Sequence, residues 1–129
     1  MLISDLPKVM FISLLCTLII EITIAFILRY RKKDLLNVLL VNVLTNPLLN
    51  SSIVAINYFY GLKIRNICLY VFEVLVILTE GYIYNKYLER KKINGYLLSL
   101  ILNIASYVIG LLINKIIYWE EFVWKRLNY

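Results

Sequence analysis

Apolar residues fill four long stretches of this chain, and polar residues gather in the short segments between them. The apolar stretches cover residues 7–28, 35–59, 67–84 and 96–117. Each is close to the ~20 residues that a helix needs to cross the ~30 Å hydrocarbon core of a bilayer. The pattern predicts an all-α, polytopic membrane protein with four transmembrane helices. Short connections require neighbouring helices to run antiparallel.

The segments between the stretches carry turn residues. A basic run at residues 29–34 follows the first stretch. Gly61 and a polar link at residues 63–66 are expected to turn the chain between the second and third stretches. Another basic run, which ends in Asn94-Gly95, precedes the fourth. The first stretch is too long for the apolar core of a signal peptide, so we expect it to be retained.

Composition points to one membrane-embedded domain over residues 1–129. Hydrophobic residues make up 62% of the chain and charged residues 17%, whereas a soluble domain has about 45–50% apolar and about 25% charged residues. The chain has no histidine, which excludes histidine metal sites and histidine bases. Cys16 and Cys68 have no CxxC partner, so we expect two small buried thiols rather than a zinc or redox motif.

The net charge of +6 indicates topology rather than a nucleic-acid partner, because Lys and Arg lie near the ends of the apolar stretches. Residues 29–34 hold four of them, residues 86–95 hold four, and the rest of the chain holds six. We expect these two turns in the cytoplasm and both termini outside, in a bacterial-type plasma membrane. No soluble segment is long enough to present a basic face to nucleic acid.

Residues 118–129, YWEEFVWKRLNY, form an amphipathic and aromatic tail. Trp and Tyr favour the headgroup layer of a membrane. We expect a C-terminal interfacial helix here. An ordinary helix end with a frayed tail is the alternative.

The two halves of the chain resemble each other, which predicts two parallel helical-hairpin repeats about an axis along the membrane normal. One glutamate in each half is followed eleven and twelve residues later by two lysines. Residues 36–45 then align with residues 97–106 after a shift of two residues in the turn. The matched polar residues are Glu21 with Glu80, Asn42 with Asn103, and Thr45 with Ser106. A chance match of two Leu- and Ile-rich hairpins is the alternative.

Polar residues inside the apolar stretches can face one common interior. Glu73 and Glu80 are seven residues apart, about two helical turns, so both lie on one face of their helix. Four polar residues from four stretches share one level, roughly 9–12 Å from the cytoplasmic helix ends. These four are Glu21, Asn42, Glu80 and Asn103. The candidate binding residues are these four with Asn46 and Glu73, and the accessory residues are Thr45, Pro47, Asn50 and Ser106.

Pro47 removes a backbone donor from the second stretch and frees the carbonyl of Val43. With Asn46 and Ser51-Ser52 nearby, we expect the helix to be kinked or locally unwound there. Discontinuous helices at membrane depth build ion and substrate sites in transporters. A simple kink satisfied by Ser and Asn side chains is the alternative.

Charge balance is the strongest pointer to function. Glu21, Glu73 and Glu80 have no Lys or Arg in the span interiors to pair with, and an ionised carboxylate at bilayer depth costs at least about 2.5–3.5 kcal/mol. They are protonated, hold a cation, or receive a basic group from a substrate or partner chain. Neutral Glu hydrogen-bonded to Asn as a link between helices is the structural alternative.

No cofactor is evident, but a bound cation is compatible with these residues. Carboxylate and amide oxygens form the shell that hard cations such as Na⁺, Mg²⁺ and Ca²⁺ prefer. If the chain binds a metal ion, the expected ligands are Glu21, Glu80, Asn42 and Asn103.

The sequence therefore predicts a proton- or cation-coupled transporter, or an ion- or substrate-binding membrane subunit. Because four spans enclose little volume, we expect a homo-oligomer or a partner membrane subunit within the lipid bilayer. A structural or scaffold subunit of a larger membrane complex is the alternative. An intramembrane enzyme that uses paired carboxylates is less favoured, because neither a nucleophile motif nor a phosphate-binding glycine loop accompanies them. Glu73, which aligns with Leu14 rather than with a glutamate, is expected to be an accessory group on an access path.

Overall fold

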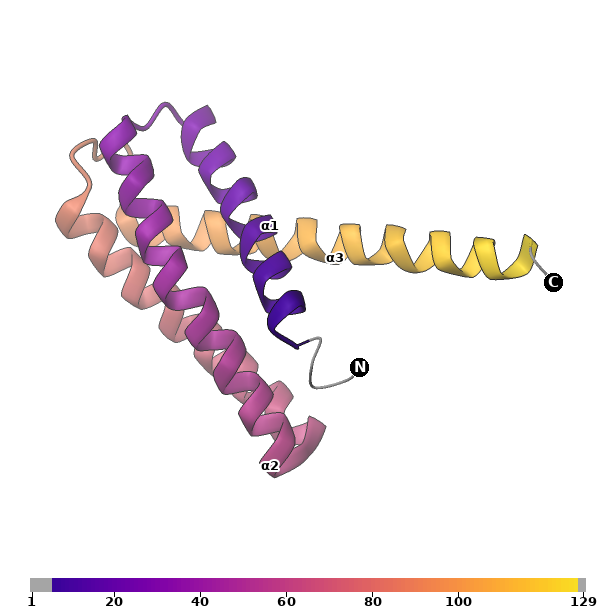
Figure 1. Ribbon diagram of the computed structural model, residues 1–129. Helices are drawn as coiled ribbons and strands as arrows, with labels where there is room; N and C mark the ends of the chain where they lie inside the picture. Colours follow the sequence, from indigo (N-terminus) through magenta and orange to yellow (C-terminus); the bar gives the residue numbers. More distant parts are fainter. Residues whose placement is uncertain (1–5, 128–129) are drawn as a thin grey trace.

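The computed structural model describes residues 6–127, with side chains for residues 10–113 and for Lys115. The helices are α1 (Leu6–Ile27), α2 (Lys32–Tyr87) and α3 (Gly95–Leu127) (Figure 1). No strand occurs among the described residues, so the all-helical prediction is confirmed. All three helices are long and apolar enough to cross a membrane.

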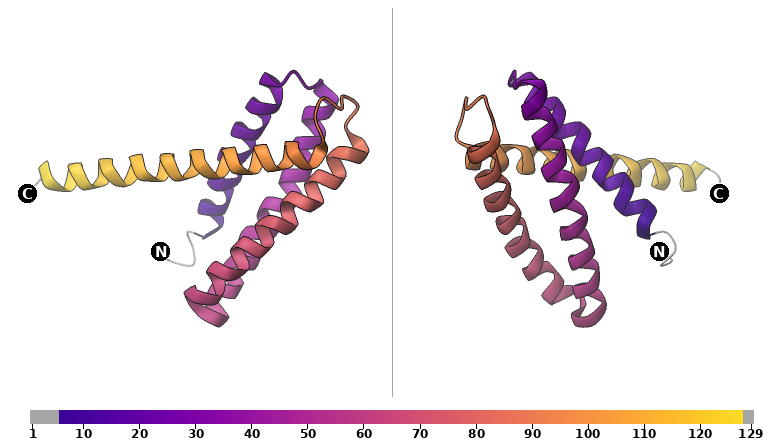
Figure 2. Two further views of the ribbon diagram at one scale, coloured as in Figure 1. Left: turned by 180° about the vertical axis from the view of Figure 1, so that it is seen from behind. Right: turned by 60° about the vertical axis from the view of Figure 1, so that its left-hand side comes forward.

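Helix α2 covers two of the predicted stretches in one element of 56 residues. Within it, only Gly61 has non-helical backbone angles, with φ 80° and ψ 177°. There the helix folds back, so that a first arm (residues 32–60) and a second arm (residues 62–87) run side by side in opposite directions (Figures 1 and 2). The polar link at residues 63–66, expected to be part of the turn, is helical. It contains neither Gly nor Pro, and one glycine is enough to reverse the chain.

The backbone of α2 remains helical through Pro47, so the expected local unwinding does not occur. The φ angle that proline requires is compatible with a helix, and its cost is one missing i→i−4 hydrogen bond. Beside it, Asn50 Nδ2 donates a hydrogen bond to Asn46 Oδ1 at 2.7 Å. This polar pair therefore lies on a continuous helix rather than at a break in one.

Helices α1 and α3 lie against the arms of α2 near one end of the molecule and diverge from them toward their other ends (Figures 1 and 2). Both interhelical turns, at residues 28–31 and 88–94, lie at the same end of the molecule, and α3 extends from there away from α1 and α2 (Figures 1 and 2). Antiparallel packing thus describes the two arms of α2, whereas α3 crosses them at a wide angle. The backbone of α3 stays helical to Leu127. The side chains of residues 118–129 are outside the described set, so their interfacial role stays a prediction.

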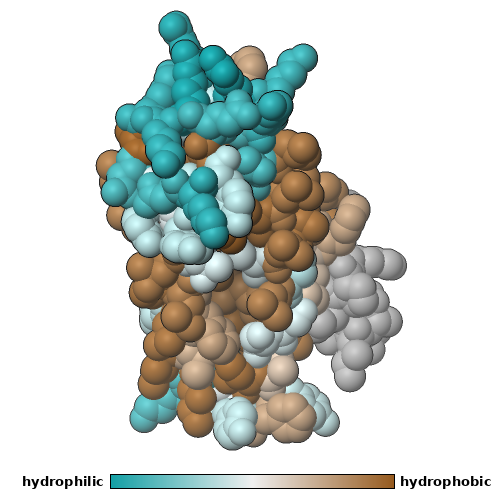
Figure 3. Space-filling view, turned by 90° about the vertical axis from the view of Figure 1, so that its left-hand side faces the viewer, coloured by the Kyte–Doolittle hydropathy of each residue, from teal (hydrophilic) through white to brown (hydrophobic). Residues whose placement is uncertain are grey.

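Hydrophilic side chains gather at the end that holds the two turns, here called the polar cap (residues 28–34 and 86–94), and apolar side chains dominate the flank below it (Figure 3). Large apolar residues such as Phe26, Leu44 and Phe59 are mostly exposed. Cys16 and Cys68 are free thiols and are half-buried, not buried as expected. An apolar flank of this extent suits hydrocarbon, because in water it would be a large exposed patch.

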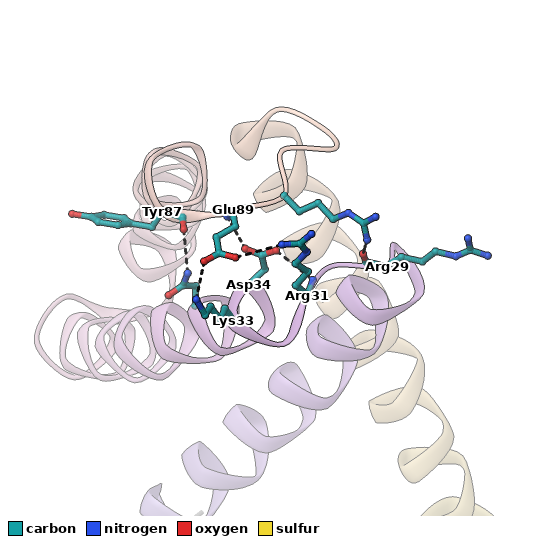
Figure 4. Close-up of polar contacts among 8 residues, drawn as sticks. Arg29, Arg31, Lys33, Asp34, Tyr87 and Glu89 are labelled. Atoms are coloured by element: carbon teal, nitrogen blue, oxygen red, sulfur yellow. Dashed lines mark hydrogen bonds and ion pairs between the residues drawn. The ribbon is translucent and has the colours of Figure 1, made fainter.

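Asp34 joins the two turns of the polar cap. Its buried carboxylate accepts hydrogen bonds from the backbone N–H of Glu89 at 2.7 Å and from that of Arg31 at 3.3 Å. Around it, Lys33 Nζ lies 3.2 Å from Glu89 Oε1, and Arg90 donates to the carbonyl of Arg29 at 2.7 Å (Figure 4). The exposed pairs contribute little, so the buried Asp34 contacts hold the turns together.

Close backbone approach positions the start of α3 on the second arm of α2. A Cβ atom added at Gly81 would lie 2.4 Å from the Tyr96 side chain, and one added at Gly95 would lie 2.6 Å from the Gly81 carbonyl oxygen. Asn85 Oδ1 also accepts the Gly95 N–H at 2.7 Å. Small residues allow helices to approach this closely in membranes, and this contact sets where α3 begins.

We expect Gly61→Ala to lower the free energy of unfolding by about 1–3 kcal/mol, since alanine at φ 80° is strained. The matched control is Gly110→Ala, because Gly110 is in α3 with open space where the Cβ would lie. It should be neutral or stabilising by up to about 1 kcal/mol. Unfolding in mixed micelles of increasing SDS content, followed by circular dichroism, measures both. Equal stability of the two variants would contradict the one-residue turn.

Candidate functional site: a buried carboxyl pair

Glu21 of α1 is fully buried and receives hydrogen bonds from two other helices. Asn42 Nδ2, on the first arm of α2, donates to Glu21 Oε2. Ser106 Oγ, on α3, lies 3.2 Å from Glu21 Oε1. Both oxygens of this carboxyl group therefore have a neutral hydrogen-bonding partner.

Glu80, on the second arm of α2, is also fully buried and has three partners. Thr45 Oγ1 lies 2.7 Å from Glu80 Oε1, and the other oxygen accepts from Asn103 Nδ2 at 2.7 Å and from Ser99 Oγ at 3.0 Å. Thr45 belongs to the first arm and the other two residues to α3. Glu21 and Glu80, here called the carboxyl pair, thus connect all four helical segments through hydrogen bonds at one level.

The contacts of the carboxyl pair follow one pattern in both halves of the chain. Each glutamate accepts from the asparagine that follows it, 21 residues later for Asn42 and 23 residues later for Asn103. Each also contacts a hydroxyl group from the opposite half of the chain, Ser106 for Glu21 and Thr45 for Glu80. These are the residues that the alignment of the two halves matches.

Both asparagine amides are held with their NH₂ groups toward the carboxyl pair. Asn42 Nδ2 also donates to the Val38 carbonyl at 3.2 Å, one turn earlier in its own helix. Asn103 Nδ2 does the same to the Ser99 carbonyl at 2.9 Å. Because the NH₂ group serves both a helix carbonyl and a carboxyl oxygen, the amide presents hydrogens rather than its oxygen to the site.

Thr45 and Ser106 each have two acceptors and one proton. Thr45 Oγ1 lies 3.1 Å from the Val41 carbonyl oxygen as well as 2.7 Å from Glu80. Ser106 Oγ lies 3.1 Å from the Asn103 carbonyl oxygen and 3.2 Å from Glu21. A hydroxyl group can donate its proton to only one of these acceptors and can accept a proton on its lone pairs. Each can therefore face a carboxylate as a donor or a carboxylic acid as an acceptor.

Two candidate binding residues, Asn46 and Glu73, and two accessory residues, Asn50 and Pro47, lie apart from the carboxyl pair. Asn46 and the accessory residue Asn50 bond to each other. Glu73 is half-buried, and among the described residues it makes no hydrogen bond or ion pair. Pro47 is half-buried within the continuous helix. The predicted set thus divides into one assembled site and a second group of polar residues, about one to two helical turns further from the polar cap.

Three residues outside the candidate set belong to the site or border it. Ser99 is fully buried against Glu80. It lies four residues before Asn103, on the same face of the helix, and this spacing could have identified it from the sequence. Tyr84 lies one turn after Glu80 and is 1% exposed, and its hydroxyl group has no hydrogen-bond partner. Tyr30, in the first turn, is 5% exposed and has the same unpartnered hydroxyl.

Outside the helical segments, Tyr30 is the residue whose ionisation the fold changes most clearly. Burial raises the pKa of its phenol above the ordinary value; the nearby backbone of Ile93 opposes this shift, and the negative charge of Asp34 reinforces it. The phenol therefore keeps its proton at physiological pH and remains a hydrogen-bond donor and acceptor beneath the polar cap.

Comparison of the chain with models of protein families, with curated proteins and with solved structures finds no match. The fold and the site define the class instead. It is an α-helical protein with helices long and apolar enough to cross a membrane, and two carboxyl groups are buried at their crossing.

We expect Thr45→Val to lower the free energy of unfolding by about 1–2 kcal/mol, because it removes a hydroxyl group from a buried carboxyl oxygen at constant side-chain shape. Thr79→Val is the matched control on the same helix, since the Thr79 hydroxyl is exposed and donates only to the Leu75 carbonyl. It should change stability by less than about 0.5 kcal/mol. SDS-induced unfolding measures both, and equal losses would show that the Thr45–Glu80 contact contributes nothing.

Proposed function

We propose that this protein is a small integral membrane protein that binds and releases protons at the carboxyl pair, either as a proton-coupled transporter or as a proton-binding subunit of a membrane complex. The observation that carries the proposal is the donor set of Glu21 and Glu80. All four carboxyl oxygens contact neutral Asn, Ser or Thr groups. Within the described side chains, neither glutamate forms an ion pair.

The geometry favours a proton over a metal cation. A cation needs oxygen lone pairs, but Asn42 and Asn103 turn their NH₂ groups toward the carboxyl oxygens and are held that way by helix carbonyls. A proton needs no such shell. It is accommodated by Thr45 and Ser106, whose hydroxyl groups can switch from donating to a carboxylate to accepting from a carboxylic acid.

The switch requires no movement of a helix. When Glu80 is ionised, the Thr45 proton is directed to the carboxylate. When Glu80 is protonated, its O–H is directed to Thr45 Oγ1, and the Thr45 proton turns to the Val41 carbonyl. Two carboxyl groups in one network titrate as a pair in two macroscopic steps, which suits repeated uptake and release.

We propose a topology of four crossings arranged as two parallel hairpin repeats. In it α1, both arms of α2 and α3 each span the bilayer, with α3 tilted relative to the other three segments (Figure 1). Each α2 arm is ~40 Å long at 1.5 Å per residue, enough to cross the hydrocarbon. The exchanged Thr45 and Ser106 contacts support the repeat. The basic residues of the polar cap support a cytoplasmic location for both turns, with the termini outside.

We also propose that Glu73 faces a second copy of the chain or a partner subunit. A half-buried carboxyl group without a described partner is costly at membrane depth, and a neighbouring helix would cover it. In the alternative role, as a structural or scaffold subunit of a larger complex, this contact would bind the partner subunit.

The principal test is infrared spectroscopy of the reconstituted protein as a function of pH, which follows the carbonyl stretch of protonated carboxyl groups. We expect Glu21→Gln and Glu80→Gln each to remove part of the titrating band and to abolish proton uptake into vesicles that contain a pH-sensitive dye. Glu73→Gln should only slow uptake. Glu89→Gln, in the exposed part of the polar cap, is the control and should leave both signals unchanged.

A panel of Na⁺, K⁺, Mg²⁺ and Ca²⁺ separates the alternatives. Saturable stabilisation by one of these ions, following RT ln(1 + [L]/Kd) and lost in Glu80→Gln, would replace the proton with a cation. If neither pH nor ions produce an effect that depends on the glutamates, the carboxyl pair is structural and the proposal fails.

For the assembly, we expect a cysteine introduced by Glu73→Cys, in a background that lacks Cys16 and Cys68, to form disulfide-linked dimers in membranes under mild oxidation. Leu78→Cys is the control, since Leu78 is exposed on another face of the same arm. Cross-linking at Leu78 alone would place the contact elsewhere. If neither cysteine cross-links and larger cross-linkers also trap only monomer, the proposed assembly is wrong.

A further inference from the structure

Two buried tyrosine side chains, Tyr30 of the polar cap and Tyr84 one turn from Glu80, take no part in the hydrogen bonds of the carboxyl pair. Tyr84 and Tyr30 are 1% and 5% exposed, and neither hydroxyl has a hydrogen-bond partner. Native structures rarely leave a buried polar group unpaired, and an unpaired one costs about 1–3 kcal/mol. Two such groups at one end of the site indicate a polar path rather than a packing defect.

Tyr84 is the group that borders the carboxyl pair. It lies four residues after Glu80 on the same face of α2, roughly 6 Å nearer the polar cap. The charges of Glu80 and Glu21 both act on its hydroxyl group, yet it hydrogen-bonds to neither. A proton transfer between the phenol and a carboxyl oxygen therefore needs a bridging water molecule.

Tyr30 occupies the outer position. It is in the turn between α1 and α2 and lies within the electrostatic range of Asp34, the buried acid of the polar cap. Tyr30 and Tyr84 belong to one buried cluster together with Leu88 and Leu98. The two tyrosine side chains therefore lie in one apolar cluster that excludes bulk water.

We propose that protons reach the carboxyl pair from the polar cap through the Tyr84 hydroxyl group, with Tyr30 as the outer member of the same path. The inference rests on the proposed proton-binding function and adds the side from which the site is loaded. The titratable groups whose charges act on Tyr84 are Glu80 on its own helix and Glu21 on α1. Among its described residues, α3 contributes the neutral Ser99, Asn103 and Ser106 to these two carboxyl groups.

The transfer conserves charge at the phenol. A hydronium ion on the cap side gives a proton to the phenol oxygen, and a new O–H bond forms there. The original O–H bond of Tyr84 breaks as its proton passes through the bridging water to a carboxylate. Hydronium becomes water, the carboxylate becomes a carboxylic acid, and the phenol ends neutral. Rotation about its C–O bond then restores the starting arrangement.

The test is the rate at which the protonated carboxyl groups exchange with deuterium. The reconstituted protein is moved from H₂O to D₂O at a pH where the carboxyl band is present, and the downshift of the band is followed in time. We expect Tyr84→Phe to slow exchange by roughly 100-fold, the lower end of what a positioned proton-transfer group contributes, with the final amplitude unchanged. Tyr30→Phe should slow it less.

Tyr82→Phe is the matched control, because Tyr82 is two residues away on the same helix but is exposed. It should exchange at the parent rate. Exchange of Tyr84→Phe at the parent rate, or equal slowing by Tyr82→Phe, overturns the path. Phenylalanine keeps the shape of the ring and removes an unpaired hydroxyl group, so we expect Tyr84→Phe to fold.

Failure of the proposed function gives a different result from failure of the path. If the carboxyl pair does not bind protons, the parent protein shows no exchanging band that Glu80→Gln removes, and both the site and the path to it are wrong. If the band is present and depends on Glu80, but its exchange is insensitive to Tyr84, only the path is wrong.

Discussion

Burial of two carboxyl groups among apolar helices is the constraint on which the rest of the structure depends. A buried polar group is tolerated only when its hydrogen-bonding capacity is met, and Glu21 and Glu80 have four oxygens between them. No single helix can supply donors to all four. Asn42 and Thr45 therefore come from the first arm of α2 and the remaining donors from α3, so the segments must converge at one level. The polar cap and the close approach of Gly81 to Tyr96 hold them there.

Much of this convergence could be predicted because helix geometry converts sequence spacing into depth. Glu21, Asn42, Glu80 and Asn103 were placed at one level by counting residues, and the structure brings them into contact as two Glu–Asn pairs. The exchange of Thr45 and Ser106 between the halves was not predicted, because it depends on the rotation of each helix. The wide crossing angle of α3 was also not predicted, because the backbone contact at Gly95 leaves no periodic pattern in the sequence. Local unwinding at Pro47 was predicted but does not occur, because the φ angle of proline is compatible with a helix.

All four oxygens of the carboxyl pair have hydrogen-bonding partners, and the hydrogens of this network can be arranged in two ways. A purely structural polar core would need only the first property, and the asparagines provide it with fixed amide groups. The hydroxyl groups of Thr45 and Ser106 are different, since each lies between a carboxyl oxygen and a carbonyl of its own helix. The network therefore has two arrangements of hydrogens on one arrangement of heavy atoms. If the carboxyl pair binds protons, as proposed, the site can change its charge without changing its packing.

The turn at Gly61 has a consequence for how the chain enters a membrane. Because one residue reverses α2, the two arms leave almost no loop between them, and Lys63 and Arg65 begin the second arm within about a turn of the bend. If both arms cross the bilayer, as proposed, these two charges have to be carried to the far surface during biosynthesis. Each costs about 2.5–3.5 kcal/mol at the centre of a membrane on the insertion scale. The apolar arms on either side make insertion of the hairpin as one unit, rather than one helix at a time, the less costly route.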